Sequence, residues 1–180
     1  MKRIEISNAL KIDRPELGDE VGIGLYRLLR LVAWEDILGP GASAISYYAG
    51  KNLGKELQVK TLEDFLDLCK QLKIGIIKIP EKTDTHIHID IYECVTCSGI
   101  EPVGRPICHF EGGMIAGAIE AITGKKVLAK EVTCIGGLGD ATCGYDLTIK
   151  QPSIDPQDTA TNLHVQTDQT VAPEDSKIDK

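Results

Sequence analysis

Aromatic side chains are scarce in this sequence: tryptophan, tyrosine and phenylalanine make up 4% of its 180 residues. Positive charge is also in deficit, because 27 acidic residues outnumber 20 basic ones and give a formal net charge of −7. A surface that binds nucleic acid carries an excess of lysine and arginine, so no nucleic-acid partner is expected. No apolar run approaches the roughly 20 residues of a membrane span, so no membrane span is expected either.

Familiar catalytic motifs are missing as well. The glycine-rich pieces GDEVGIG and GGLGD do not follow a strand and open a helix, as a dinucleotide-binding fingerprint must. No arrangement of serine, histidine and aspartate typical of a nucleophilic hydrolase can be recognised. The sequence therefore predicts no catalytic residue.

Six cysteines are present, and five of them lie between Cys94 and Cys143, whereas Cys69 stands apart. The N-terminal stretch MKRIEISNALKIDRP alternates charged and apolar residues and lacks the apolar core of a signal peptide, so we expect a cytoplasmic protein. In that reducing compartment the cysteines are expected to be free thiols or metal ligands rather than disulfides.

The hydrophobic periodicity changes along the chain in an order that predicts the fold class. A short strand is expected at RIEIS, and helices before Gly39, from Ala42 to Leu57, behind a capping box of Thr61 and Asp64, and from Pro106 to Ile122. Period-2 runs predict two hairpins, KIGIIKIP with THIHIDIY and KKVLAKEVT with TCGYDLTIK. We expect one α+β domain over residues 1–150, an antiparallel sheet of two hairpins covered by helices on one face. Residues 151–180, rich in Asp, Gln, Thr and Pro, are predicted to form a disordered acidic tail.

Two features of the helices bear on their packing. In the first helix the apolar side chains fall on one face, with Arg27 and Arg30 off it; these apolar residues are Val21, Leu25, Leu28, Leu29 and Val32. Gly50 and Gly54 in the second helix are expected to make close packing contacts, and Gly113 and Gly117 would likewise let another backbone approach closely.

The stretch KEVTCIGGLGDATCGYD points to a metal site. Cys108 is expected in the first turn of its helix, where the helix dipole favours a thiolate, and Cys134 and Cys143 flank a glycine-rich turn. Glu131 would point away from Cys134 on a regular strand, so a shared site needs a bulge near Thr133. With that bulge, three thiolates and one carboxylate form a closed tetrahedral sphere suited to structural zinc.

Other interpretations of these residues stay open. The cysteines can instead be small buried hydrophobic side chains. Cys94 and Cys97 form a C-x-x-C pair that suits redox chemistry or an auxiliary metal set. His86 and His88 share one face of their strand and can ligate a metal there, although a solvated polar face is the simpler interpretation.

The run from Tyr92 to Ile149 resembles the 4-vinyl reductase domain family, on YECVTCSG, GRPICHFEGG and KEVTCIGGLGDATCGYD, and the N-terminal helices resemble it more loosely. Related domains are the sensory part of bacterial activators that respond to aromatics. The resemblance implies a structural zinc on Cys108, Glu131, Cys134 and Cys143. It also implies a pocket for an apolar ligand between sheet and helices, at Ile87, Ile89, Phe110, Gly112 and Ala129. Ile87, Gly112 and Ala129 stand where the phenol sensors carry aromatic residues, which argues against a phenol clamp.

Three functions follow from the residues and the resemblance together. The first is a zinc-stapled domain that binds or carries a hydrophobic ligand such as a tetrapyrrole, as an accessory factor in chlorophyll synthesis or photosystem assembly with assembly proteins as partners. The second is a vinyl reductase of tetrapyrrole synthesis, which needs a hydride or electron source. The third is a non-catalytic scaffold. A homodimer is expected from the resemblance in each case.

Overall fold

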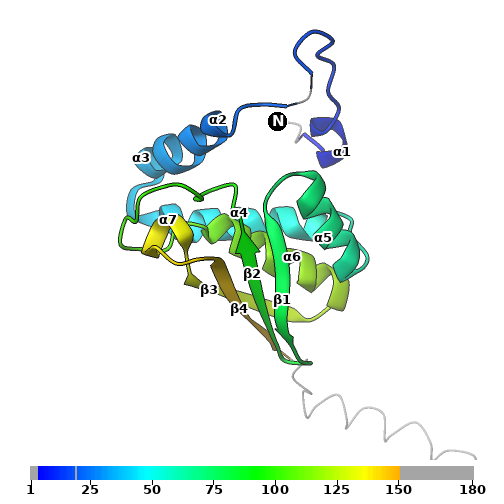
Figure 1. Cartoon of the computed structure of the whole chain (residues 1–180). Helices are drawn as coiled ribbons and strands as arrows, with labels where there is room; N and C mark the ends of the chain where they lie inside the picture. Colours follow the sequence, from blue (N-terminus) through cyan, green and yellow to red (C-terminus); the bar gives the residue numbers. More distant parts are fainter. Residues whose placement is uncertain (1–3, 19, 151–180) are drawn as a thin grey trace, which may run out of the picture.

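The computed structural model describes residues 4–18 and 20–150, so the predicted acidic tail at 151–180 lies outside the described residues. Its four strands form one antiparallel sheet in the order β1-β2-β4-β3. The strands are β1 (Ile76–Lys82), β2 (His86–Tyr92), β3 (Lys126–Thr133) and β4 (Cys143–Lys150). Both predicted hairpins are confirmed, and β4 pairs with β2 to join them into one sheet (Figure 1).

Period-2 alternation decides which face of the sheet is buried. In β2 the side chains of Ile87, Ile89 and Ile91 are at most 3% exposed, and the residues between them are only partly buried. In the edge strand β1 the pairing register shifts between Lys78 and Glu81, around Pro80, which has no N–H to donate to the sheet. The inward isoleucines of β2 face the helices that cover the sheet.

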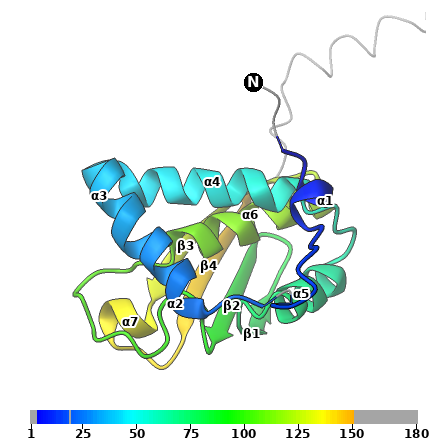
Figure 2. The same cartoon turned by 90° about the horizontal axis from the view of Figure 1, so that it is seen from above.

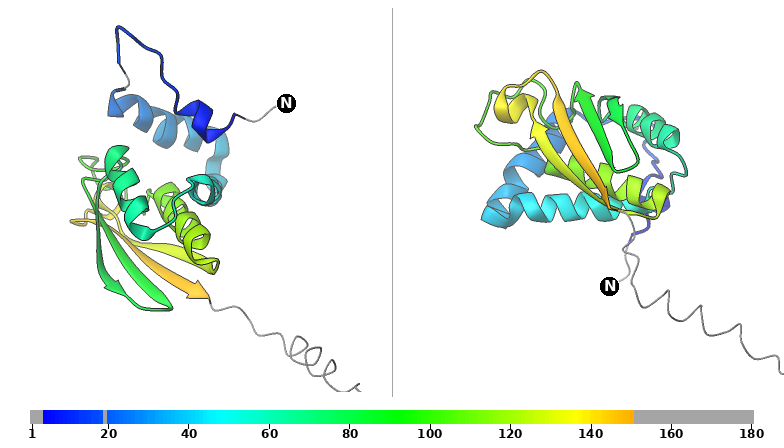
Figure 3. Two further views of the ribbon diagram at one scale, coloured as in Figure 1. Left: turned by 90° about the vertical axis from the view of Figure 1, so that its right-hand side faces the viewer. Right: turned by 90° about the horizontal axis from the view of Figure 1, so that it is seen from below.

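Those helices are α4 (Ala42–Glu56), α5 (Leu62–Gln71) and α6 (His109–Thr123). Figures 2 and 3 show them on the same side of the sheet, with α6 between α4 and the strands. The predicted α+β arrangement with helices on one face is therefore confirmed. Every residue of α6 from Glu111 to Glu120 is buried, as its position between two layers requires. The predicted capping box is also present, since Thr61 and Asp64 exchange side-chain to backbone hydrogen bonds.

Close contact between α4 and α6 depends on glycine. A Cβ atom on Gly50 or Gly54 would lie 2.1 Å from a backbone oxygen of α6, and one on Gly113 or Gly117 would lie 2.0 Å from a backbone oxygen of α4. Such separations are far inside van der Waals contact, so no other residue fits without moving a helix. The predicted close approach at these four glycines is confirmed.

The N-terminal elements differ from their prediction in two ways: a helix replaces the predicted strand, and the following helix contains a π-helical turn. Residues Ile6–Ala9 form a short helix, α1, so the strand predicted at RIEIS is wrong. The following helix consists of α2 (Ile23–Arg27), a π-helical turn (Leu28–Ala33) and α3 (Trp34–Leu38); we call residues 23–38 the α2–α3 segment. A short 3-10 turn at Gly39–Gly41 then leads into α4.

The α2–α3 segment directs its arginines inward and its apolar face outward. Arg27 donates from Nε to the carbonyl of Val95 and from Nη2 to the carbonyl of Ser98, both at 2.9 Å, and Arg30 pairs with buried Glu111. The apolar residues of the predicted face are more than half exposed; they are Val21, Leu25, Leu28, Leu29 and Val32. An amphipathic helix usually buries its apolar face. Here the face that carries Arg27 and Arg30 packs against the domain instead, because both arginines have polar partners there.

None of the helices in the described ranges is both long enough and apolar enough to cross a membrane.

Candidate metal centre

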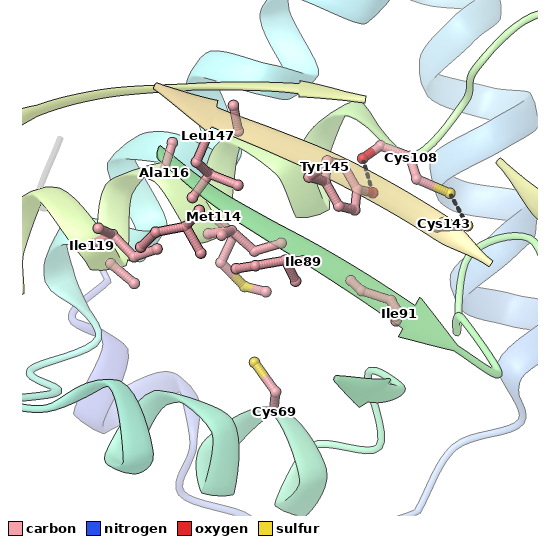
Figure 4. Close-up of a cluster of buried hydrophobic side chains, with 14 of the residues drawn as sticks. Cys69, Ile89, Ile91, Cys108, Met114, Ala116, Ile119, Cys143, Tyr145 and Leu147 are labelled. Atoms are coloured by element: carbon pink, nitrogen blue, oxygen red, sulfur yellow. Dashed lines mark hydrogen bonds between the residues drawn. The ribbon is translucent and has the colours of Figure 1, made fainter. Parts of the chain in front are cut away.

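Five cysteines from separate parts of the chain meet at one end of the sheet. They are Cys94 and Cys97 in the loop after β2, Cys108 at the N-cap of α6, Cys134 after β3, and Cys143 at the start of β4, and all are fully buried free thiols. Figure 4 shows the sulfurs of Cys108 and Cys143 facing one another, beside the Tyr145 hydroxyl that donates to the Cys108 carbonyl at 2.9 Å. Thiols that converge in this way offer the soft sulfur ligands that a thiophilic metal prefers.

The helix that carries Cys108 starts later than predicted. Its first residue is His109, so Pro106 lies before the helix and Cys108 is its N-cap residue instead of part of the first turn. The thiol still lies at the N-terminal end of α6, as the interpretation of this residue requires. The shift of three residues therefore changes the boundary of the helix without moving Cys108 from its end.

Glu131 reaches the thiols because β3 is irregular at the predicted place. The pairing of β3 with β4 shifts register between Glu131 and Thr133, and this bulge turns the carboxylate toward the side of Cys134. The Glu131 side chain is 3% exposed, and both of its oxygens accept from the backbone N–H of Cys108, at 3.1 and 3.3 Å. Burial raises the pKa of Glu131 to about 10, so the carboxylate needs a cation to stay ionised at neutral pH.

The donor atoms have the spacing that a tetrahedral ion requires. The ligand atoms of Cys108, Glu131, Cys134 and Cys143 all lie within 4.8 Å of one another, and the Cys108 sulfur is 3.9 Å from the sulfurs of both Cys134 and Cys143. A Zn–S bond of about 2.3 Å places two sulfurs of a tetrahedron about 3.8 Å apart. The four residues therefore fit a thiophilic divalent ion without rearrangement.

A second group of four donors overlaps the first. Cys94, Cys97, Cys108 and Cys143 also lie within 4.8 Å of one another, with the Cys94 sulfur 3.6 Å from Cys108 and the Cys97 sulfur 3.2 Å from Cys143. Hydrogen bonding with Cys108 lowers the pKa of Cys94, Cys97 and Cys134, and the pKa of Cys108 itself is raised. The thiols are thus within hydrogen-bonding distance of one another, and a bound ion would take the place of their protons.

The turn between β3 and β4 contains a short helix, α7 (Ile135–Leu138), where the sequence predicted only a turn. A Cβ on Gly137 would lie 2.7 Å from the Cys134 sulfur, and one on Gly136 would lie 2.5 Å from the Cys97 carbonyl oxygen. The N–H of Ile135 points to the Cys143 sulfur at 3.5 Å. The two glycines therefore let a backbone turn close over the thiols, and GG after Cys134 was the signal for it.

His86 and His88 lie on the opposite face of the sheet. The Nδ1 atom of His88 is 2.7 Å from an Asp146 carboxylate oxygen, and this hydrogen bond raises the pKa of His88. Within residues 4–18 and 20–150, neither of the two groups of donors close enough to share an ion includes a histidine. The imidazoles thus belong to a polar ladder between β2 and β4.

The five residues of the predicted ligand pocket occupy the core and its edge. Ile87, Ile89 and Ala129 belong to the buried cluster between sheet and helices, and a Cβ on Gly112 would meet the Tyr145 ring at 2.8 Å. Phe110 is partly buried under the Arg30 guanidinium, which lies 4.7 Å from the ring centroid.

A cavity of about 460 Å³ lies elsewhere, between the α2–α3 segment and the loop of residues 98–107. Most of its lining is apolar, with two arginines and a glutamate among the lining residues, and Arg105 is paired with Glu35 at 2.5 Å. The lining residues are Gly24, Arg27, Leu28, Leu31, Val32, Glu35, Ile100, Val103, Arg105 and Ile107. This cavity depends on a helix and a loop distant in sequence, so no local pattern could have identified it.

A buried polar network connects the α2–α3 segment to Thr96, in the segment between Cys94 and Cys97. Glu111, at 1% exposure, accepts from the Thr96 hydroxyl at 2.6 Å and from the Tyr26 hydroxyl at 3.1 Å, and pairs with Arg30 at 3.3 Å. Burial raises the pKa of Tyr26 well above its usual value, so its hydroxyl stays a donor. The network ties the α2–α3 segment to the loop that carries Cys94 and Cys97.

Comparison with known proteins places the fold. The model of the protein family described as "protein of unknown function (DUF2507)" matches residues 24–134. The uncharacterized protein MJ1642 of Methanocaldococcus jannaschii is 36% identical over 134 residues, which are 74% of this chain and 81% of that protein.

Two solved structures have a similar fold. A vinyl-4-reductase family protein of M. jannaschii superposes with a TM-score of 0.61 at 22% identity, covering 76% of this chain and 86% of that one. The phenol-responsive sensory domain of the transcription activator PoxR, solved with phenol, superposes with a TM-score of 0.58 at 17% identity, covering 78% and 81%. The predicted resemblance is confirmed at the level of the fold. The chain belongs to the DUF2507 family and has the fold shared by vinyl-4-reductase family proteins and the PoxR sensory domain.

Proposed function

We propose that this protein is a metal-stapled domain that binds a hydrophobic small molecule in the cavity between the α2–α3 segment and the 98–107 loop. One observation carries the proposal: this loop runs from Cys97 to Cys108, and both of these residues lie in the thiol cluster. An ion held by the cluster fixes one or both ends of the loop. The metal therefore has a structural role, and it shapes one wall of the cavity.

The closed set of four protein donors supports zinc in that role. Cys108, Glu131, Cys134 and Cys143 would fill a tetrahedral sphere and leave no position for water, which is the pattern of structural and not of catalytic zinc. A reducing, cytoplasmic environment would keep the free thiols available for the ion. The cavity volume of about 460 Å³ lies within the range of small-molecule sites, and its apolar lining suits a flat hydrophobic ligand.

A tetrapyrrole is the first ligand to test, because its flat apolar ring system suits the apolar lining, and Arg105, half exposed beside Glu35, is a cation at the cavity for a carboxylate. Accessory roles in chlorophyll synthesis or photosystem assembly, and a vinyl reductase activity, are narrower forms of this proposal that depend on such binding. The PoxR domain, which was solved with phenol, shows that the fold can hold an aromatic molecule.

The test combines metal analysis with ligand titration on the full chain, purified without chelator. We expect bound zinc, and we expect Gly24→Phe to weaken binding of protoporphyrin by about tenfold or more, because it adds a ring at a cavity-lining position with open space around it. Gly22→Phe is the matched control, since it also adds a ring in open space but does not line the cavity.

Unchanged protoporphyrin affinity in Gly24→Phe would place the ligand elsewhere, including the predicted pocket at Ile87, Ile89, Phe110, Gly112 and Ala129. Absence of zinc from the wild-type protein would contradict the structural metal site in this proposal. Loss of the vinyl absorbance of a bound pigment on addition of a hydride donor would instead favour the reductase.

We further propose that the protein is a homodimer that buries the outward apolar face of the α2–α3 segment around Leu25 and Leu29, whereas Leu28 and Val32 of that face line the cavity. Leu25 and Leu29 are 54% and 52% exposed on this face, and Val21, just before the helix, is 57% exposed. A row of exposed apolar side chains on one helix is typical of an interface. We expect wild-type protein to sediment as a dimer and the double variant Leu25→Glu, Leu29→Glu as a monomer. Leu128→Glu, at a site 54% exposed on the sheet, should remain dimeric, and a monomeric wild type would contradict the proposal.

A further inference from the structure

The thiol cluster has more donors than one ion can use. Six donor atoms fall into two groups of four, and both groups contain Cys108 and Cys143. A single tetrahedral ion in the first group would leave the buried thiols of Cys94 and Cys97 against two of its own ligands, at 3.6 and 3.2 Å. These two thiols therefore have no role in the mononuclear arrangement.

Two tetrahedra that share an edge use all six donors. The shared edge is the pair of sulfurs of Cys108 and Cys143, 3.9 Å apart, close to the spacing of about 3.8 Å expected for two sulfurs on one zinc ion. Cys94 and Cys97 then complete one tetrahedron, and Glu131 and Cys134 complete the other. Each tetrahedron has four protein donors, so neither requires water.

We propose that the cluster holds two divalent thiophilic ions, bridged by the thiolates of Cys108 and Cys143. This inference rests on the proposed metal staple and extends it by a second ion. The second ion displaces the protons of Cys94 and Cys97, which leave as two H⁺. Its two positive charges equal the two that depart, so the buried charge of the cluster does not change. Entry of the second ion therefore adds no uncompensated charge to a site that solvent does not reach.

The local backbone around Cys94 and Cys97 already has the form of a metal-binding loop. The N–H groups of Cys97 and Ser98 both donate to the Cys94 carbonyl, at 3.2 and 3.0 Å, which curls the C-x-x-C segment so that both sulfurs point to the same side. Paired C-x-x-C cysteines of this kind are common zinc ligands.

The second ion would connect two parts of the molecule that the first ion does not. Glu131, Cys134, Cys108 and Cys143 join the last hairpin to α6, whereas Cys94 and Cys97 belong to the segment that receives Arg27 through the carbonyls of Val95 and Ser98. An ion on the Cys94 side therefore supports the anchor of the α2–α3 segment, and with it the opposite wall of the cavity.

The experiment counts metal per chain by mass spectrometry in full-length protein reconstituted with Zn²⁺ under reducing conditions. We expect two ions in the wild type, and one each in Cys97→Ser and Cys134→Ser, because each variant removes a terminal ligand of one tetrahedron. Cys69→Ser is the control: it replaces a buried thiol outside the cluster and should keep two. Cadmium-113 NMR of wild-type protein, which needs no variant, should give two resonances of equal area with cadmium–cadmium coupling through the shared sulfurs.

The wild type could instead bind one ion, which Cys97→Ser keeps and Cys134→Ser loses. That result would contradict the second ion and leave the proposed structural metal site intact. One ion lost in Cys97→Ser but kept in Cys134→Ser would overturn the second ion and move the staple to the Cys94 group. No ion in the wild type would overturn the second ion and the staple together.

Discussion

A Gly113→Ala substitution is expected to destabilise the protein by about 3 kcal/mol, even though alanine favours a helix over glycine by roughly 1 kcal/mol. The added Cβ would lie 2.0 Å from the Tyr47 carbonyl oxygen and 2.9 Å from the Lys51 nitrogen. Both atoms belong to the backbone of α4, so the methyl group can be accommodated only if the two helices separate. The change in free energy of unfolding, measured by urea titration, tests this.

The matched control is Gly24→Ala. Gly24 is also in a helix, but a Cβ there meets no atom within 4 Å, so helix propensity alone should act and stabilise the protein by up to about 1 kcal/mol. Opposite signs for the two glycines are therefore expected. If Gly113→Ala were as stable as the wild type, the close contact between α4 and α6 described above would be incorrect.

Substitution of Arg30 by methionine is expected to cost about 3 kcal/mol at neutral pH. The Arg30 and Glu111 side chains are 9% and 2% exposed, so removal of the guanidinium leaves a buried carboxylate without its cation. Methionine keeps most of the apolar length that packs on the Phe110 ring, which isolates the loss of charge. Urea unfolding of the variant gives the size of the effect.

A double-mutant cycle separates the charge effect from packing. Glu111→Gln keeps the acceptor oxygen for Thr96 and Tyr26 but removes the negative charge. We therefore expect the double variant Arg30→Met, Glu111→Gln to be more stable than Arg30→Met alone, by about 1 kcal/mol or more. Simple addition of the two single effects would mean that the pair is not coupled.

Sequence patterns predicted the features that depend only on residues close together in the chain. The two-residue period of a strand required a bulge between Glu131 and Cys134, and the register shift lies there, between Glu131 and Thr133. The spacing of Thr61 and Asp64 likewise predicted a cap that forms within four residues. In both cases the atoms that interact are neighbours in sequence, so geometry along the chain determined the outcome.

Sequence patterns did not predict the features that depend on contacts between residues far apart in the chain. Helical periodicity showed that Arg27 and Leu25 lie on different faces, but it could not show that the arginine face is the inward one, because its acceptors are the carbonyls of Val95 and Ser98. The sequence left open an auxiliary metal set with Cys94 and Cys97, but it could not place Cys94 beside Cys108, since that position follows from the course of the loop between β2 and α6. The cavity shares this dependence, because its two walls come from separate segments.

The strand order has a consequence for how the metal centre forms. β2 pairs with β4 and not with its nearer neighbour β3, so the middle of the sheet stays open until the last strand arrives. Pairings this distant in sequence form slowly. Cys143 begins that last strand and belongs to both groups of donors, so neither group is complete on a ribosome-bound chain that has not yet released β4. We therefore expect ion loading to be a late event of biosynthesis, and full metal occupancy to distinguish finished molecules from truncated ones.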